Sequence, residues 1–213
     1  MKKQDNQWRG LYLVTPNWDD TARLLAVTEQ ALERGVCLLQ YRHKTADATL
    51  RLEQASALQG LCRRFGVPFI INDYLDLCQQ LDADGLHVGG TDISVAQARA
   101  QLGADKILGA SCYGDLALAQ SAFEQGASYM AFGGFYPSVV KKYPVTTSHT
   151  IVAEAKASIP LPLVVIGGMN PALAQPLVAQ GADMVAAISS VYLADDVGVA
   201  VQAFQDLFSL QSR

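Results

Sequence analysis

A chain of 213 residues, 50% hydrophobic and 17% charged, is long enough to bury a full core and has the composition of an ordinary globular protein. Its net charge of -4 gives no overall attraction to nucleic acid or to an anionic membrane, so neither is expected as a partner. No apolar run reaches the roughly 18 residues that cross a bilayer, and no apolar segment follows the N-terminal lysines, so a cytoplasmic location is expected.

The four cysteines are Cys37, Cys62, Cys78 and Cys112, and no two of them are close in the sequence. This spacing argues against a zinc site and against a disulfide framework. We therefore expect all four to be small core residues.

Short apolar runs alternate with helical patterns along the whole chain. The expected strands are 11–15, 37–42, 68–72, 85–89, 106–111, 129–134, 161–168 and 183–190. Helical periodicity is clearest over 22–35, 47–65, 116–125, 147–158 and 197–210, and one further helical pattern ends near residue 81. Strands that read as continuous apolar runs, each followed by a helix, indicate a parallel sheet covered by helices.

Eight such units of about 26 residues each predict an α/β fold, a single-domain (β/α)₈ barrel over residues 1–213, with 1–10 as a flexible N-terminal extension. A doubly wound open sheet is the alternative. That fold requires a glycine-rich fingerprint after the first strand, and LYLVTPNWDD at 11–20 has none.

Polar residues collect where the predicted strands end, which is the face that carries the active site in such barrels. Gln40, Arg42 and Lys44 alternate after the second strand, so their side chains share one face. Asp73 and Asp92 follow the third and fourth strands and are expected at the same mouth. Two carboxylates there could hold a hard divalent cation together with substrate oxygens.

A second anion site is expected on the other side of the barrel. Glycine-rich 167–170 and Ile188-Ser189-Ser190 follow the last two strands, where many barrels bind a phosphate through backbone N–H groups. The long loop 135–149, which follows the sixth strand, carries Ser138 and Lys141 and is a candidate lid. One diphosphate substrate would fit the charged, metal-bearing site, and one monophosphate substrate would fit the backbone-lined site.

The motifs, taken together, resemble those of the thiamine phosphate synthase family from Leu11 to the end of the eighth strand. They are QYRHK at 40–44, IND at 71–73, ADGLHVGGTD at 83–92, GASCY at 109–113, GGFYPSVVKK at 133–142, VIGGMN at 165–170 and AAISS at 186–190. The resemblance implies an enzyme that joins 4-amino-2-methyl-5-hydroxymethylpyrimidine diphosphate to a thiazole phosphate or its carboxylated form. The products would be thiamine phosphate and diphosphate, formed by a dissociative mechanism with Mg²⁺ as cofactor.

The resemblance also implies roles for individual residues. Asp73 and Asp92 would bind magnesium. Arg42, Lys44, Asn72 and Lys141 would hold the diphosphate, with Ser138 beside it; Gln40 and Ser111 would contact the pyrimidine; Gly168, Ile188 and Ser189 would bind the thiazole phosphate. Arg42, Lys44, Ser111 and Lys141 would thus be the catalytic set. The expected partners are small-molecule substrates. Whether the protein forms a homo-oligomer is left open by the sequence.

The chain departs from the family pattern at three positions. Gly90 replaces a glutamine, and Ser138 and Val140 replace two threonines; the valine cannot donate to a phosphate oxygen, and losing one neutral hydrogen bond costs about 1 kcal/mol. Asp73 and Asp92 precede helical patterns and could instead be N-caps. His87 is expected in the barrel core or behind the site, not on a metal.

Two other functions stay open from the sequence. A paralogue that isomerises thiazole phosphate would not need Lys44, Asp73 and Asp92, and a non-catalytic thiamine-precursor binding protein would explain the changes at Ser138 and Val140. An unrelated phosphosugar isomerase barrel is a more distant alternative. Magnesium-dependent diphosphate release separates the synthase from all of these.

Overall fold

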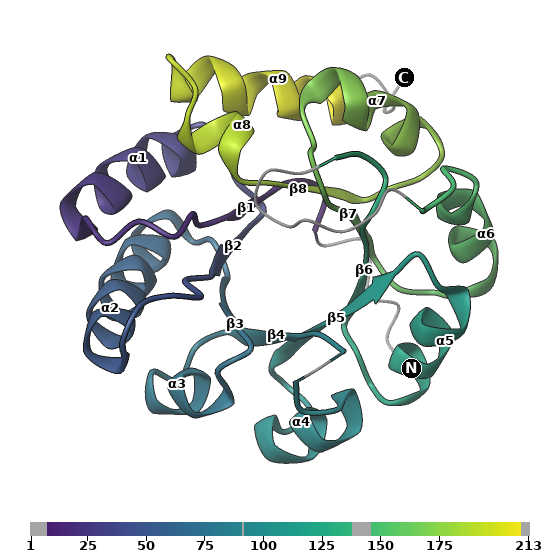
Figure 1. The fold of residues 1–213 in the computed structure, drawn as a ribbon, viewed down its shortest axis with the longest axis horizontal. Coiled ribbons are helices and arrows are strands. Elements are labelled where there is room, and N and C mark those ends of the chain that lie inside the picture. Colours follow the sequence, from purple (N-terminus) through teal and green to yellow (C-terminus); the bar gives the residue numbers. More distant parts are fainter. Residues whose placement is uncertain (1–7, 91, 138–145, 210–213) are drawn as a thin grey trace.

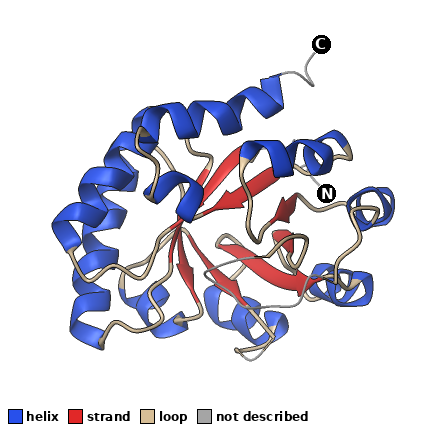
Figure 2. Cartoon of the chain, turned by 45° about the horizontal axis from the view of Figure 1, so that its top comes forward, coloured by secondary structure: helices blue, strands red, loops and turns tan. Residues whose placement is uncertain are grey.

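The computed structural model describes residues 8–90, 92–137 and 146–209 and shows a closed barrel of parallel strands ringed by helices (Figures 1 and 2). The strands are β1 (Gly10–Val14), β2 (Leu38–Tyr41), β3 (Phe69–Asn72), β4 (Gly85–Val88), β5 (Ile107–Tyr113), β6 (Tyr129–Phe132), β7 (Leu163–Val165) and β8 (Met184–Ala187). They pair in sequence order, and β8 closes the barrel on β1 with Leu13 opposite Ala187. The predicted (β/α)₈ barrel is confirmed.

The helices form the outer ring, and most begin where the sequence offers a cap. They are α1 (Thr21–Glu33), α2 (Ala48–Phe65), α3 (Leu75–Gln80), α4 (Val95–Leu102), α5 (Leu116–Glu124), α6 (Ile151–Ser158), α7 (Pro171–Ala179), α8 (Ser189–Tyr192) and α9 (Val197–Ser209). Asp20 caps α1 and Asp47 caps α2 by accepting backbone N–H groups at 2.9 and 2.8 Å. Among the described residues, no helix is long and apolar enough to span a membrane.

Two hydrophobic cores follow from the alternation of side chains along each strand. The larger core fills the space between the strands and the helices. The smaller core fills the barrel interior and includes Tyr12, Leu38, Tyr129 and Met184. The interior is therefore packed and not a pore. Of the four cysteines, three are buried, and all four are free, as the absence of a disulfide framework in the sequence predicted.

Several expected boundaries need correction. The extension expected over 1–10 does not include residues 8–10, because Gly10 opens β1 and Trp8 packs edge-on against Tyr129 with ring centroids 6.3 Å apart. The seventh strand ends at Val165 because Gly167 and Gly168 have positive φ angles, which a strand does not allow. The eighth gives way to the short helix α8 at Ser189, which was not expected.

Candidate active site

The two carboxylates predicted at the mouth lie together beyond the carboxyl ends of β3 and β4. Asp73 has a φ of 65° and its N–H donates to the carbonyl of His87 at 2.9 Å. Asp92 accepts the N–H of Gly89 at 2.8 Å. Neither residue caps a helix, since α3 begins after Tyr74 and α4 is capped by Ser94, so the alternative N-cap interpretation is wrong.

The charges at this mouth are strongly linked. Burial raises the pKa of the Asp73 carboxyl above its ordinary value; the neighbouring Asp92 raises it further, while the Lys44 ammonium, which contacts Asp73 directly, opposes the rise. The Asp73 side chain is 14% exposed and that of Lys44 is 44% exposed. Two neighbouring carboxylates, of which Asp73 is paired with Lys44, favour a further positive charge.

The polar residues at the end of β2 have different surroundings. Gln40 points into the barrel and donates to the Tyr12 hydroxyl at 2.8 Å, and Arg42 is 8% exposed at the end of the strand. His43 faces the other way, where its Nδ1 accepts the N–H of Ala46 at 3.0 Å and its Nε2 lies 3.1 Å from Asp19. Asn72 is buried at the end of β3.

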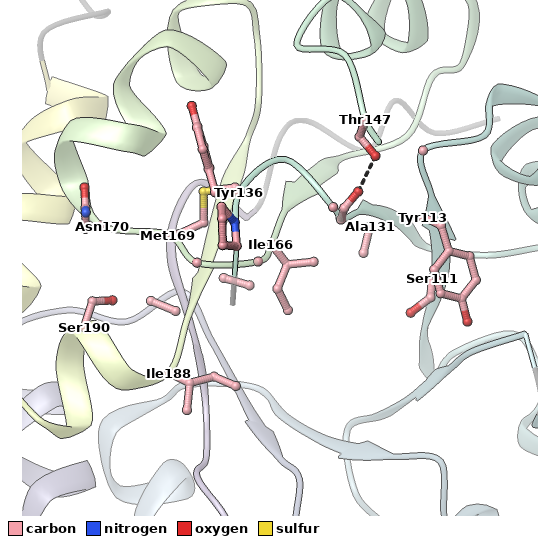
Figure 3. Close-up of a pocket in the computed structure, with 18 of the residues that line it drawn as sticks. Ser111, Tyr113, Ala131, Tyr136, Thr147, Ile166, Met169, Asn170, Ile188 and Ser190 are labelled. Carbon is pink, nitrogen blue, oxygen red and sulfur yellow. Dashed lines mark hydrogen bonds between the residues drawn. The ribbon is translucent and has the colours of Figure 1, made fainter. Parts of the chain in front are cut away.

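A cavity of about 450 Å³ opens on the opposite side of the mouth, over the ends of β5 to β8 (Figure 3). Four predicted residues line it: Ser111, Gly168, Ile188 and Ser189. The remaining predicted residues that the structure describes, Gln40, Arg42, Lys44, Asn72, Asp73 and Asp92, do not line this cavity. The candidate site thus has a charged half over β2 to β4 and a mostly apolar half over β5 to β8.

The far wall of the cavity is formed by backbone packed closely at Gly168 and by the buried hydroxyl of Ser190. Gly168 has a φ of 64°, and a Cβ atom there would overlap the carbonyl oxygen of Pro137. The hydroxyl oxygen of Ser190 is buried at the cavity and has no hydrogen-bond partner among the described residues. A buried hydroxyl in this condition is stabilised by a polar ligand.

Ser111 lies where the two halves meet. Its hydroxyl is 2.9 Å from Nε2 of His87, which places the His87 ring inside the barrel behind Ser111. Two residues further on, the Tyr113 hydroxyl accepts the N–H of Gly90 at 3.0 Å, and Tyr113 has a φ of 53°, which is uncommon for a non-glycine residue. Figure 3 shows Ser111 and Tyr113 on one side of the cavity and Asn170 and Ser190 on the other.

Three cavity residues were given no individual role by the sequence analysis, although Ser190 was named among the residues that follow the eighth strand. Ser190 follows the predicted Ser189, and both lie in the first turn of α8, a helix that the sequence did not predict. Thr147 donates to the carbonyl of Gly133 at 2.6 Å, the dashed bond in Figure 3, and Tyr136 donates to the carbonyl of Leu173 at 2.9 Å. Both belong to the loop identified as a candidate lid, and no motif in the sequence marked them. Ser138 and Lys141, and the change at Val140, lie outside the described residues.

The residues at the charged half fit a magnesium ion. Two adjacent carboxylates supply oxygen ligands, and burial together with the neighbouring Asp92 raises the pKa of Asp73, so a cation here would stabilise the charged form. Among the described residues, no group of three or more His, Cys, Asp and Glu side chains could hold a metal. This suits Mg²⁺, which takes one or two carboxylates and completes its shell with water and substrate phosphate.

Comparison with known proteins identifies the family of the chain. A family model described as thiamine monophosphate synthase matches residues 11–191. The thiamine-phosphate synthase of Janthinobacterium sp. (strain Marseille) is 68% identical over 200 residues, which cover 94% of this chain and 97% of that protein. The thiamine-phosphate synthase of Xanthomonas campestris pv. campestris (strain 8004) is 48% identical over 201 residues, covering 94% and 96%.

A solved structure extends the similarity to three dimensions. Thiamine phosphate pyrophosphorylase from Pyrococcus furiosus superposes with a TM-score of 0.83 at 28% identity, over 96% of this chain and 98% of that one. The chain therefore belongs to the thiamine monophosphate synthase family and is an enzyme, a transferase.

Proposed function

We propose that this enzyme joins 4-amino-2-methyl-5-hydroxymethylpyrimidine diphosphate to a thiazole phosphate, giving thiamine phosphate and diphosphate. The observation that supports the proposal is the separation of the charged residues on one side of Ser111 from the cavity wall at Gly168 and Ser190 on the other. The charged half, with Arg42, Lys44, Asp73 and Asp92, suits the diphosphate and its metal. The cavity wall at Gly168 and Ser190 suits a monophosphate, and the space of about 450 Å³ between suits two small aromatic rings.

The chemistry required is the departure of a diphosphate, and this chain's residues favour charge separation. The bond between the pyrimidine methylene carbon and the diphosphate oxygen breaks, and its electron pair leaves with the diphosphate. Arg42 and Lys44 stabilise the negative charge on that leaving group, and one added charge at about 4 Å is worth roughly 4 kcal/mol at an effective dielectric near 20. The thiazole nitrogen then donates its lone pair to the carbon.

Asp73 and Asp92 would hold Mg²⁺ beside the leaving diphosphate. The ion, when bound, supplies charge neutralisation of the diphosphate. Lys44 contacts Asp73 in this structure and so stands at the edge of that site, where its ammonium can turn from the carboxylate to the substrate. No nucleophilic side chain is required, because the reaction proceeds through ionisation and not through a covalent enzyme intermediate.

Water competes for the electron-deficient carbon, so the cavity must exclude it. Its walls are largely aliphatic and aromatic, with Ile166, Ile188 and Met169 on one side and Tyr113 on the other (Figure 3). The loop that carries Thr147 is held to the end of β6, since the Thr147 hydroxyl donates to the Gly133 carbonyl. These contacts place an apolar wall against the expected position of the rings.

The test is diphosphate release on mixing the protein with both substrates, with and without Mg²⁺. We expect release only when pyrimidine diphosphate, thiazole phosphate and the metal are all present. Release of diphosphate that is unaffected by removing Mg²⁺ with a chelator would refute the metal assignment. Binding of thiazole phosphate without any release would refute the synthase reaction and favour an isomerase or a binding protein.

A further inference from the structure

A line of hydrogen bonds crosses the interior of the barrel and links the two residues expected at the pyrimidine. Gln40 on β2 contacts the Tyr12 hydroxyl at 2.8 Å, and the Tyr12 and Tyr129 hydroxyls are 2.7 Å apart. The Tyr129 hydroxyl lies 2.9 Å from Nδ1 of His87, and Nε2 of His87 lies 2.9 Å from the Ser111 hydroxyl. The five residues come from β2, β1, β6, β4 and β5.

The interior is shaped to allow this line. Tyr12 and Tyr129 are 1% and 0% exposed, and their rings meet edge-on with centroids 5.7 Å apart. His87 stacks on Tyr129 at 5.6 Å. A Cβ atom at Gly109, which pairs with Tyr129 across β5 and β6, would overlap the Tyr129 ring, so glycine there makes room for it. An apolar interior needs none of these polar groups, and each would be costly if it were unsatisfied.

The chemistry of the groups gives the line a direction. The Gln40 amide nitrogen can only donate, so the Tyr12 hydroxyl accepts from it, and Tyr129 is then the neighbour to which Tyr12 can give its own proton. Burial raises the pKa of both phenols, so each keeps its proton. Tyr129 then donates to Nδ1 of His87, which leaves the imidazole proton on Nε2, facing the Ser111 oxygen.

The consequence falls on Ser111. Its oxygen accepts from His87, and its own proton is therefore directed away from the imidazole, toward the cavity that it lines. If every hydrogen bond in the line were reversed, Ser111 would donate to His87 and would offer only its lone pairs to the cavity. A ring nitrogen of a pyrimidine is a hydrogen-bond acceptor and is recognised only by the first arrangement.

We propose that Tyr12, Tyr129 and His87 are positioning residues that act through Ser111, holding its hydroxyl as a hydrogen-bond donor to an acceptor nitrogen of the pyrimidine. The proposal rests on the proposed function, in which the pyrimidine lies against Ser111. It adds three residues that touch no substrate and that none of the motifs assigns to the reaction.

The kinetic test is a double-mutant cycle with Tyr129→Phe and Ser111→Ala. We expect Tyr129→Phe to lower kcat/KM for the pyrimidine diphosphate about tenfold, the scale of one lost hydrogen bond, and to leave KM for the thiazole phosphate unchanged. In the Ser111→Ala background the same change should have less than about a twofold effect, because the two residues act as one unit. Effects that multiply would overturn the proposal.

Tyr192→Phe is the matched control. Its hydroxyl is also buried and also paired with a hydroxyl, that of Thr28 at 2.8 Å, but it lies between α8 and α1, outside the barrel interior. We expect it to lower the thermal midpoint as much as Tyr129→Phe does and to leave kcat/KM unchanged. Equal kinetic losses in both variants would mean that only stability is involved. If Tyr129→Phe does not fold, Tyr12→Phe breaks the same line one bond earlier and replaces it in the cycle.

A spectroscopic measurement tests the direction without substrate. The chain has three histidines, so the nitrogen resonances of His87 can be assigned by comparison with a His87→Gln variant. We expect a neutral ring protonated at Nε2. A ring protonated at Nδ1, or an imidazolium that donates from both nitrogens, would overturn the proposal even if the enzyme turns over. An enzyme without turnover that shows the expected ring would refute the proposed function and leave the positioning line intact.

Discussion

Replacing Gly168 by alanine tests whether the close backbone approach at the cavity wall binds the thiazole phosphate. Gly168 has a φ of 64°, and an alanine Cβ there would overlap the Pro137 carbonyl oxygen while lying 3.2 Å from its carbon and 3.3 Å from Cβ of Tyr136. The left-handed backbone costs about 1 to 2 kcal/mol for a non-glycine residue. The overlap costs about 1 to 3 kcal/mol more, because a backbone group must move.

Gly66 provides a control with the same backbone angle. It ends α2 with a φ of 66°, and a Cβ added there meets nothing within 4 Å. Gly66→Ala therefore carries the strain alone, and Gly168→Ala carries the strain and the overlap. For a chain of this length, 1 kcal/mol shifts Tm by about 2 to 4 °C, so thermal unfolding can separate the two contributions.

The assay is steady-state kinetics with each substrate varied in turn. Moving the Pro137 carbonyl shifts the wall that faces the phosphate, so Gly168→Ala should raise KM for thiazole phosphate at least tenfold and leave KM for the pyrimidine diphosphate within about twofold. Gly66→Ala should leave both constants unchanged. A Gly168→Ala enzyme with wild-type KM for thiazole phosphate would refute the assignment of this wall to the phosphate.

Two further predictions concern the carboxylates. Asp92→Ala should abolish metal-dependent diphosphate release and leave Tm within about 2 °C of the wild type, because a carboxylate at the barrel mouth supports no core packing. Asp82→Ala is the matched control and should retain activity, since it removes an exposed carboxylate that is bound to Lys106 at 2.5 Å. Asp73→Asn should raise Tm of the metal-free protein at pH 7. The folded-state pKa of Asp73 lies above its unfolded value, so wild type loses stability as the pH rises through that pKa, and the advantage of the variant should disappear below about pH 4. A gap that widens on acidification would contradict the sign.

Much of the fold could be predicted because each strand and helix carries its own local signal. The strands are continuous apolar runs, and Asp20 and Asp47 mark helix starts in the sequence and in the structure. The strand ends that were predicted wrongly depend on backbone angles. At Gly167 and Gly168, for example, glycine has no side chain and can therefore adopt several backbone conformations. Periodicity cannot choose among these conformations, because it reports which side chains are buried and not where a strand ends.

The site was predictable only as far as topology places it. Parallel strands bring Asp73 and Asp92 to one mouth whatever the details of packing, so their proximity followed from the order of elements. The contact between Tyr12 and Tyr129 did not, because these residues are 117 positions apart and meet across the barrel interior. Which inward side chains of non-adjacent strands touch is decided by the tilt and stagger of the closed sheet. Neither quantity can be read from a run of apolar residues.

The change at position 90, a departure from the family pattern, has a structural counterpart at position 113. A Cβ atom at Gly90 would lie 3.2 Å from the Tyr113 hydroxyl and 3.4 Å from its ring, so any longer side chain would compete with the tyrosine for this space. The Gly90 N–H instead donates to that hydroxyl at 3.0 Å, and Tyr113 accepts a φ of 53° to reach it. Strain of this kind persists only where the surroundings fix it. Tyr113 therefore fills the place left open at Gly90, and the mouth between Asp92 and Ser111 keeps a polar group although the glutamine is absent.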